Sequence, residues 1–182
     1  MHVLVPLAPG FEEIEAVTII DVLRRAGCEV TAAFLTTNPV KGSHGIEVTA
    51  DAALADVSAG DFGAIALPGG MPGSEHLKQD ERVLHIIRVL SSSGGLVAAI
   101  CAAPIALGAA GVLAGRRATC YPGFEHEMKG AIPVNEPVVR DGNIITGRGP
   151  ACAIPFALAL VAALAGDETA RGLTQTMQAY WM

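Results

Sequence analysis

Val97–Pro104, with the sequence VAAICAAP, joins a short apolar run to a segment rich in Ala and Leu. The run Leu96–Ile100 carries no charge, which is typical of a strand buried on both faces of a parallel sheet. The segment Ala102–Leu113 favours a helix, and Pro104 suits its first turn. The pattern therefore predicts that Cys101 lies where a buried strand is followed by a helix.

Such a position suits a reactive thiol. A side chain before a helix faces unpaired backbone N–H groups and the positive end of the helix dipole, and both favour the thiolate. A sharp strand-to-helix turn also lifts the side chain clear of the sheet. We therefore expect Cys101 to be the most acidic and most reactive of the four thiols, with a pKa of about 3.5–7.5. The alternative is a small buried core residue, which is what most free cysteines are.

Length and composition describe one packed domain. The 182 residues are 51% hydrophobic and 16% charged, which is typical of an α/β protein and excludes a disordered chain. A chain of this size buries about 70% of its unfolded surface, so its stability requires neither a disulfide nor a metal. We predict a single domain that spans residues 1–182.

Charge and cysteine usage exclude several classes of partner. The net charge is −6 and no more than two basic residues are adjacent, so the sequence offers no basic cluster that would attract the phosphates of a nucleic acid. No apolar run is long enough to span a membrane, and the N-terminus has no basic leader region, so we expect neither membrane anchor nor signal peptide. The four cysteines form no CxxC pair, which favours a reduced, cytoplasmic protein without structural zinc.

Apolar runs alternate with amphipathic segments along the chain. Besides the run before Cys101, strands are predicted at His2–Leu7, Glu29–Leu35, Phe62–Leu67 and Arg117–Cys120, with a side hairpin including Gly45–Thr49 and a second hairpin of Val134–Arg140 and Asn143–Thr146. Asp51–Asp61 is predicted to be a polar connection. Helices are predicted at Glu12–Ala26, Ser74–Leu90, from Arg148–Pro150 through Ala165, and at Asp167–Gln178, which leads into the apolar end Tyr180–Trp181–Met182.

The first predicted helix, Glu12–Ala26, has apolar residues at helical spacing. The repeat runs through Ile14 and Val17, then Ile20 or Asp21, and Leu23 or Arg24. The acidic residues Glu12 and Glu13 are expected to serve the helix N-terminus, where negative charge is favourable.

Strands that alternate with helices predict an α/β fold with a parallel sheet and right-handed crossovers. In such sheets, sites form beyond the carboxyl ends of the strands. Three of these ends have unusual sequences, namely PGFEEIEA after the first strand, LPGG after the third and ICAAP at Cys101. If these strands are neighbours, Glu12, Glu13 or Glu15 and the pair Gly69–Gly70 surround Cys101.

Four motifs together resemble one family. Pro9–Glu15, Leu67–Gly70, Ala99–Pro104 and Arg148–Pro150 resemble the ThiJ/PfpI superfamily, in order and at similar separations. Within it, the chain is similar over nearly its whole length to the branch of the Parkinsonism-associated protein deglycase and its bacterial relatives. The resemblance implies a flavodoxin-like three-layer sandwich with a mostly parallel sheet, related to class I glutamine amidotransferases. It also implies a homodimer.

The resemblance assigns roles to five residues. Cys101 matches the reactive cysteine, and Glu15 matches the carboxylic acid that hydrogen-bonds its sulfur. Gly69 and Gly70, with the N–H of Ala102, match the oxyanion pocket. A carboxyl group in a dry pocket beside a thiolate stays protonated and donates its proton, so it can act as general acid and base. The alternative for Glu15, taken alone, is a solvated helix glutamate.

The chain departs from the family pattern at two positions. Tyr121 stands where this branch often has a histidine, and a phenol with a pKa near 10 is a poorer base at neutral pH. Ala102 stands where the protease-like branch has a histidine, which argues against peptidase activity. His126 is close to Tyr121 in sequence, but a solvated loop position is expected for it.

Three further residues have weaker assignments. Arg25 and His44 match positions where the family gathers cations near the dimer side of the pocket, and His44 replaces a residue that is often arginine. A helical Arg such as Arg25 is otherwise a surface charge. Cys120 is either a resolving thiol for Cys101 or a buried cysteine at a strand end.

These observations favour a cofactor-independent enzyme that acts on small dicarbonyls such as methylglyoxal, or on their early adducts with amines. Cys101 would add to the aldehyde carbon, Glu15 would transfer the proton, and Tyr121 would orient the substrate. A redox-sensing or chaperone-like stress protein, in which Cys101 is oxidised without turnover, is the alternative. An inactive structural dimer that keeps the pocket is the third possibility. No metal or cofactor is expected.

Overall fold

The computed structural model describes residues 1–179, so the expected apolar end, Tyr180–Trp181–Met182, lies outside the described residues. The strands are β1 (His2–Leu7), β2 (Glu29–Phe34), β3 (Val40–Lys41), β4 (Glu47–Val48), β5 (Ala52–Ala53), β6 (Ala64–Leu67), β7 (Leu96–Ile100), β8 (Arg117–Ala118), β9 (Ile132–Pro133), β10 (Val138–Asp141) and β11 (Ile144–Gly147). The helices are α1 (Glu13–Arg25), α2 (Gly73–Gln79), α3 (Glu81–Ser93), α4 (Pro104–Ala110), α5 (Ala153–Ala165) and α6 (Asp167–Thr176).

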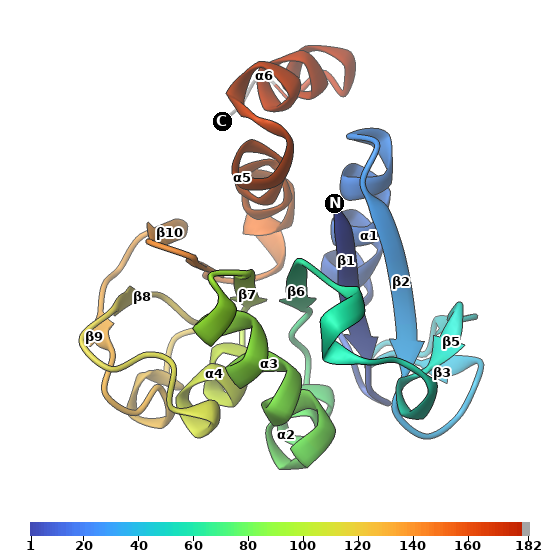
Figure 1. Cartoon of the computed structure of the whole chain (residues 1–182), viewed down its shortest axis with the longest axis vertical. Helices are drawn as coiled ribbons and strands as arrows, with labels where there is room; N and C mark the ends of the chain where they lie inside the picture. Colours follow the sequence, from blue (N-terminus) through green and yellow to red (C-terminus); the bar gives the residue numbers. More distant parts are fainter. Residues whose placement is uncertain (180–182) are drawn as a thin grey trace.

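A seven-stranded sheet forms the centre of the protein, in the order β10-β11-β7-β6-β1-β2-β5 (Figure 1). Its neighbouring strands are parallel, apart from the antiparallel pair of β10 and β11. The predicted side hairpin is confirmed as the antiparallel pair of β3 and β4. The expected α/β sandwich with a mostly parallel sheet is confirmed.

Helices cover both faces of the sheet because each central strand is apolar on both sides. Along β1, Val3, Val5 and Leu7 pack on the face that α1 and α5 cover, whereas Leu4 packs on the opposite face with α3 and α4. These alternate directions follow from the period of two along a strand. The continuous apolar runs in the sequence therefore reflect burial on two sides. Within residues 1–179, no helix combines the length and apolar character that crossing a membrane would need.

The order of the strands brings the three unusual strand ends together. Strands β7, β6 and β1 are direct neighbours and run parallel, so ICAAP, LPGG and PGFEEIEA leave the sheet at the same edge. The sequence predicted this edge as the site only on the condition that the strands were adjacent. The structure satisfies that condition.

Helix α1 leaves two of its regularly spaced apolar residues exposed. Ile14 and Val17 are 58% and 49% exposed, whereas Ala16, Ile19 and Val22 are buried. The reason is that the inner face also contains Glu13 and Glu15, which are buried although they are charged residues. The spacing of the hydrophobic residues alone does not show that these two carboxyl groups lie inside.

The predicted helix Ser74–Leu90 is in fact two helices. Between α2 and α3, Asp80 has an extended backbone, with φ −84° and ψ 108°, and its side chain accepts a hydrogen bond from the N–H of Arg82. Asp80 is thus the N-cap of α3, a role for which aspartate is well suited.

Three other boundaries differ from the expectations. Helix α4 is shorter than predicted because Gly111 ends it in the left-handed region. Helix α5 begins only after a 3-10 turn at Pro150–Cys152. The stretch Asp51–Asp61, which was expected to be a polar connection, contributes the short edge strand β5. Two residues are too few to show the alternation of polar and apolar side chains by which a strand is predicted.

Candidate active site

Cys101 lies directly after β7, at the turn that leads to α4, as the sequence predicted. Its backbone φ is +62°, a left-handed conformation that non-glycine residues rarely adopt. Two neighbours hold this conformation: the N–H of Cys101 donates to the carbonyl of Gly147, and its carbonyl accepts from the N–H of Tyr121. Backbone strain of this kind, which costs about 1–3 kcal/mol, persists where the surroundings fix a side chain in a required direction.

Glu15 projects from the first turn of α1 toward Cys101 and is fully buried. Its Oε2 accepts a hydrogen bond of 2.7 Å from the N–H of Gly69, and its Oε1 has no hydrogen-bond partner among the described residues. Burial, the largest effect, and the charge of Glu12 raise the pKa of Glu15 to about 7, although hydrogen bonds from Gly69 and Cys101 lower it. The solvated glutamate that we considered as an alternative is therefore excluded.

Gly69 allows the side chains of Cys101 and Glu15 to approach each other because it has no side chain of its own. A Cβ atom at Gly69 would lie 2.6 Å from the Cβ of Cys101 and 2.7 Å from Oε2 of Glu15, closer than atoms can pack. Gly70 has a φ of +93° and lies against the backbone of Glu12. The LPGG motif thus brings Cys101 and Glu15 together by leaving room for both.

Replacing Gly69 with Ala is expected to destabilise the fold by about 1–3 kcal/mol, because the added methyl group over-packs a buried site. It should also separate Glu15 from Cys101 and alter the alkylation rate of the thiol. Urea unfolding and thiol labelling measure the two effects. Gly172→Ala is the matched control, since nothing lies within 4 Å of a Cβ there. Equal unfolding midpoints for the two variants would contradict this description of the site.

The sequence predicted a low pKa for the Cys101 thiol, but the surroundings of this thiol raise its pKa. Burial, the largest effect, and the negative charge of Glu15 raise the pKa of Cys101 to about 12, although backbone N–H groups of Gly70 and Ala102 lower it. Helix α4 begins only at Pro104, so the sulfur does not lie at its first turn. The charge of Glu15 acts only when that carboxyl is ionised. A thiolate at Cys101 therefore requires a protonated Glu15.

A cavity of about 470 Å³ opens above Cys101. Tyr121 and Phe124 from the loop after β8 line one side of it, and Tyr121 is 47% exposed. The other lining residues are Glu12, Ile14, His44, Gly70, Met71, Cys101, Ala102 and Pro150. The structure thus brings Gly70, Ala102 and Tyr121 to one cavity with Cys101, with Glu15 and Gly69 buried directly behind. The catalytic and substrate-binding roles of these residues remain predictions.

The remaining candidates lie apart from the reacting pair. The side chain of His126 is 76% exposed and faces Glu127 at 3.9 Å, as expected for a loop histidine. Arg25 pairs with Asp21 at 2.6 Å on the surface of α1. Cys120 is buried, and burial raises the pKa of its thiol to about 11. Cys120 thus resembles the buried strand-end cysteine more than a resolving thiol.

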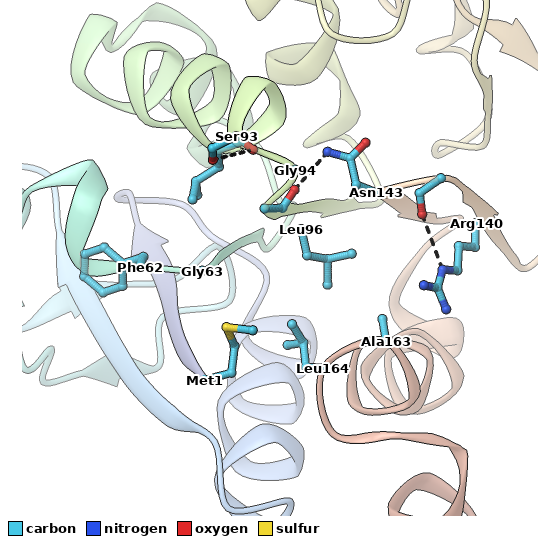
Figure 2. Close-up of a pocket in the computed structure, with 13 residues that line it drawn as sticks. Met1, Phe62, Gly63, Ser93, Gly94, Leu96, Arg140, Asn143, Ala163 and Leu164 are labelled. Atoms are coloured by element: carbon cyan, nitrogen blue, oxygen red, sulfur yellow. Dashed lines mark hydrogen bonds between the residues drawn. The ribbon is translucent and has the colours of Figure 1, made fainter.

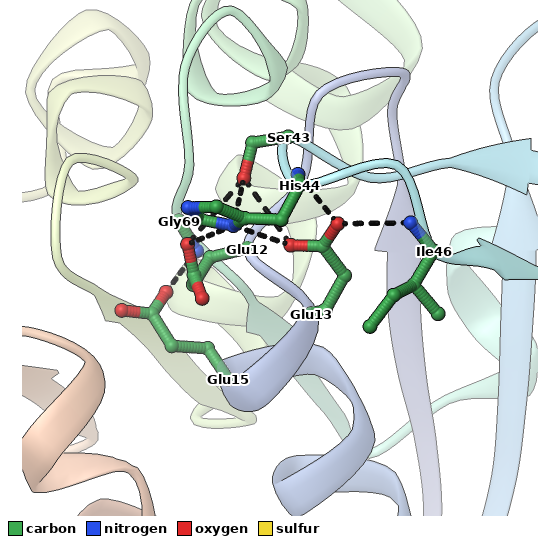
Figure 3. Close-up of polar contacts among 7 residues, drawn as sticks. All are labelled: Glu12, Glu13, Glu15, Ser43, His44, Ile46 and Gly69. Atoms are coloured by element: carbon green, nitrogen blue, oxygen red, sulfur yellow. Dashed lines mark hydrogen bonds and ion pairs between the residues drawn. The ribbon is translucent and has the colours of Figure 1, made fainter.

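Glu13 has a role that the sequence did not indicate. It is buried, and instead of serving the start of α1 it binds the loop after β3 (Figure 3). Its Oε1 accepts the N–H of His44 at 2.7 Å and that of Ile46 at 3.4 Å, while Oε2 accepts from the Ser43 hydroxyl at 3.2 Å. Burial raises its pKa, but the hydrogen bonds from His44 and the loop outweigh this and lower the pKa to about 2. In the sequence, the residue that could have indicated this role of Glu13 is Gly42, because any side chain there would overlap the Glu13 carboxylate.

Two other features could hold a ligand. Among the described residues, Glu12, Glu13 and His44 place their ligand atoms within 4.8 Å of one another, as a metal ion would require, but Glu13 is already occupied by the loop. A second cavity, of about 440 Å³, lies at the amino-terminal edge of the sheet, between Met1, Phe62 and Asn143 (Figure 2). Its described lining contains no Cys, His, Asp or Glu, and the hydroxyl of its one serine, Ser93, donates to the carbonyl of Leu90.

Comparisons with known proteins agree with this geometry. Residues 1–163 match the model of the DJ-1/PfpI family. The chain is 42% identical to "Protein dj-1beta" of Drosophila melanogaster over 177 residues, which cover 93% of this chain and 95% of the relative. It is 37% identical to "Glutathione-independent glyoxalase DJR-1.2" of Caenorhabditis elegans over 168 residues, covering 91% and 89%.

One relative is longer, and one solved structure shows the same fold. The chain is 44% identical to "Protein DJ-1 homolog A" of Arabidopsis thaliana over 172 residues, 92% of this chain but 44% of the plant protein. It therefore spans less than half of that relative. The structure of an oxidized DJ-1 from Toxoplasma gondii superimposes with a TM-score of 0.93 at 38% identity, covering 97% of each chain. From the family match and these identities, the chain belongs to the DJ-1/PfpI family.

Proposed function

We propose that the protein is a cofactor-independent, cysteine-dependent glyoxalase or deglycase that acts on methylglyoxal-type dicarbonyls or their early adducts. The buried carboxyl group of Glu15, which is within hydrogen-bonding reach of the Cys101 thiol and whose Oε1 has no partner among the described residues, carries this proposal. A carboxylate oxygen left unpaired in a buried site is costly, whereas a protonated oxygen there can donate to a thiolate. The name of the worm relative supports the reaction class.

The first step is addition of the thiolate to the aldehyde carbon of methylglyoxal. A C–S bond forms, the C=O π bond breaks, and the oxygen becomes an alkoxide. The N–H groups of Gly70 and Ala102, which already point to the sulfur, are placed to stabilise that charge. Glu15 then donates its proton to the alkoxide and yields a neutral hemithioacetal.

The second step uses the same carboxyl group as a base. Glu15, now ionised, removes the proton from the former aldehyde carbon, and an enediolate forms with its negative charge on the neighbouring oxygen. Return of this proton to the adjacent carbon, together with transfer of the hydroxyl proton from the first oxygen to the second, gives a lactoyl thioester on Cys101, so one carbon is oxidised and its neighbour is reduced. Water hydrolyses the thioester to lactate and restores the thiol. A group with a pKa of about 7 can both give and take the proton near neutral pH.

Lactate formation tests this proposal directly. The purified protein, incubated with methylglyoxal and without glutathione, is expected to form lactate at a rate that rises in proportion to protein concentration. A lactate yield equal to that of buffer would contradict the proposal. Release of the amine from a pre-formed adduct, faster than the adduct dissociates by itself, would distinguish deglycation from action on the free dicarbonyl.

Oxidation of Cys101 without turnover is the second candidate function. The N–H groups of Gly70 and Ala102 that would hold an oxyanion could equally hold the oxygens of a sulfinate, with Glu15 protonated beside them. Mild peroxide treatment followed by mass mapping is expected to add two oxygens to Cys101. Loss of lactate formation in proportion to this oxidation would show that the modified thiol is the catalytic one.

The protein is also proposed to form a symmetric homodimer, with α1 at or near the interface. Ile14 and Val17 lie on its exposed face, so the alternative that both pack only on their own sheet is excluded. Light scattering at micromolar concentration should give twice the monomer mass of 18.6 kDa. Ile14→Asp is expected to give folded monomers, because it buries a charge in the interface. A wild-type monomer would contradict the dimer, and a dimer of Ile14→Asp would place the interface elsewhere.

A further inference from the structure

The segment that follows β8 connects two parts of the candidate site. The N–H of Tyr121 donates to the carbonyl of Cys101 at 2.8 Å and helps to hold the left-handed backbone of this residue. The ring of Tyr121 lies against Gly149, where a Cβ atom would be 3.3 Å from Cδ2 of the tyrosine. The position of residues 119–121 therefore decides both how Cys101 is held and where Tyr121 enters the cavity.

This segment is not part of the main sheet. Within the described part of the chain, β8 pairs only with β9, and the two form a small sheet of their own (Figure 1). The backbone of β11 already pairs with β7 on one side and β10 on the other. Two side chains link the main sheet to β8 and the residues after it. Oδ2 of Asp141 accepts the N–H of Arg117 at 2.9 Å, and Oγ1 of Thr146 accepts the N–H of Thr119 at 2.9 Å.

The link from Thr146 lies inside the core. Thr146 is 0% and Thr119 is 1% exposed, so water does not reach either group. Thr146 points to the same face of β11 as Ile144, and that side chain belongs to the core cluster that also contains Cys120. A buried N–H that loses its acceptor finds no water in its place, which makes such a bond costly to lose. The hydroxyl of Thr146 thus fixes the chain two residues before Tyr121.

We propose that Thr146 is a positioning residue for the reaction at Cys101, and that it acts through the backbone of Thr119 and Tyr121. The inference deepens the proposed function and rests on it, because Cys101 and Tyr121 are the groups that it places. While the segment holds the carbonyl of Cys101, the sulfur stays beside the two backbone N–H groups that stabilise its thiolate. Without the Thr146 hydroxyl, the segment and that carbonyl are released together. The alternative is that threonine simply suits a strand, and valine would then serve as well.

Substitutions at position 146 separate these explanations. Thr146→Val keeps the branched shape and removes the acceptor, whereas Thr146→Ser keeps the hydroxyl. Iodoacetamide labelling of Cys101, followed by mass mapping while each variant is folded, is expected to be about three- to ten-fold slower in Thr146→Val, which is the effect of one hydrogen bond on an equilibrium. Thr146→Ser should label within about two-fold of the wild type. Thr119→Val is the matched control and should keep the wild-type rate, since its buried Oγ1 has no hydrogen-bond partner among the described residues.

Hydrogen exchange measures the position of the segment itself. In Thr146→Val, the amides of Thr119 and Tyr121 are expected to exchange at least about ten-fold faster, while those of β1 are unchanged. In the wild type, the Thr119 amide should be protected like the amides of β11. This second result also decides the question if Thr146→Val does not fold: protection supports the inference, and exchange at the rate of an exposed loop overturns it.

Lactate formation tests the same residue in the reaction. Thr146→Val is expected to lower kcat by about ten-fold, and Thr146→Ser should restore most of it. An unchanged labelling rate in Thr146→Val, or equal losses in Thr146→Val and Thr119→Val, would overturn the inference and leave the proposed function intact. Slower labelling in Thr146→Val, with no lactate formed by the wild type, would overturn the proposed function alone.

Discussion

Cys101→Ala is expected to abolish dicarbonyl turnover, with a loss of about 10³-fold or more, while Cys120→Ala keeps most of the activity. Without the thiolate no hemithioacetal forms, and no other group at the cavity is a comparable nucleophile. Cys120 is the matched control because it is also a buried thiol and its chain neighbour Tyr121 is hydrogen-bonded to Cys101. Lactate formation measures both variants. Equal losses in the two would point to a general effect on packing.

The same assignment is open to a chemical test. Iodoacetamide labelling followed by mass mapping is expected to modify Cys101 before the other thiols, because Cys101 lines the open cavity and its thiolate, formed when Glu15 is protonated, can accept two backbone N–H groups. Cys120 does not line this cavity and is 1% exposed. Preferential labelling of Cys28 or Cys152 would refute the special position of Cys101.

Glu15→Gln is expected to slow turnover by about 10²-fold or more, because the amide neither gives nor takes a proton at the substrate carbon. The fold should persist, since the amide oxygen can still accept the N–H of Gly69. Tyr121→Phe should have a smaller effect, since its hydroxyl is proposed to orient the substrate. A loss from Tyr121→Phe as large as that from Glu15→Gln would reverse these roles, and a fully active Glu15→Gln would exclude the mechanism.

Unfolding experiments give the Glu15 substitution a second readout. The pKa of Glu15 is raised from 4.5 to about 7, so the folded protein holds a proton that the unfolded chain releases between these values. Its stabilisation is complete below the unfolded pKa and declines as the pH rises through 7. Between about pH 5 and pH 9, the wild type should therefore lose about 3 kcal/mol relative to Glu15→Gln in urea unfolding. Parallel pH profiles would show that Glu15 is not buried as a neutral acid.

The order of strands and helices could be predicted because short-range patterns determine it. The uncharged run before Cys101 is buried on both faces of the sheet in β7, since its alternate residues belong to the two separate core clusters, and the alternation of strands with helices requires a parallel sheet. The strand-to-helix position of Cys101 followed from the same local pattern. The break at Asp80 did not, because the helical spacing of apolar residues continues on both sides of it and only the cap interrupts the backbone.

The candidate site depended on contacts between distant parts of the chain. Glu15 and Gly69 are hydrogen-bonded across 54 residues, and Glu13 reaches His44 across 31. No local pattern distinguishes these buried glutamates from solvated ones. Their burial follows from the adjacency of β1, β6 and β7, which brings the start of α1 against LPGG.

By itself, the sequence determined that an α/β sheet with Cys101 at a strand-to-helix turn would form, because periodicity and turn residues act within a few positions. Only the tertiary structure decided which face of α1 is buried, that Glu13 binds the loop of His44, and that the pKa values of Cys101 and Glu15 are both raised. These properties depend on how much water reaches each group and which charges lie beside it. Distances along the chain do not contain that information, because folding sets it by packing segments that are remote in sequence.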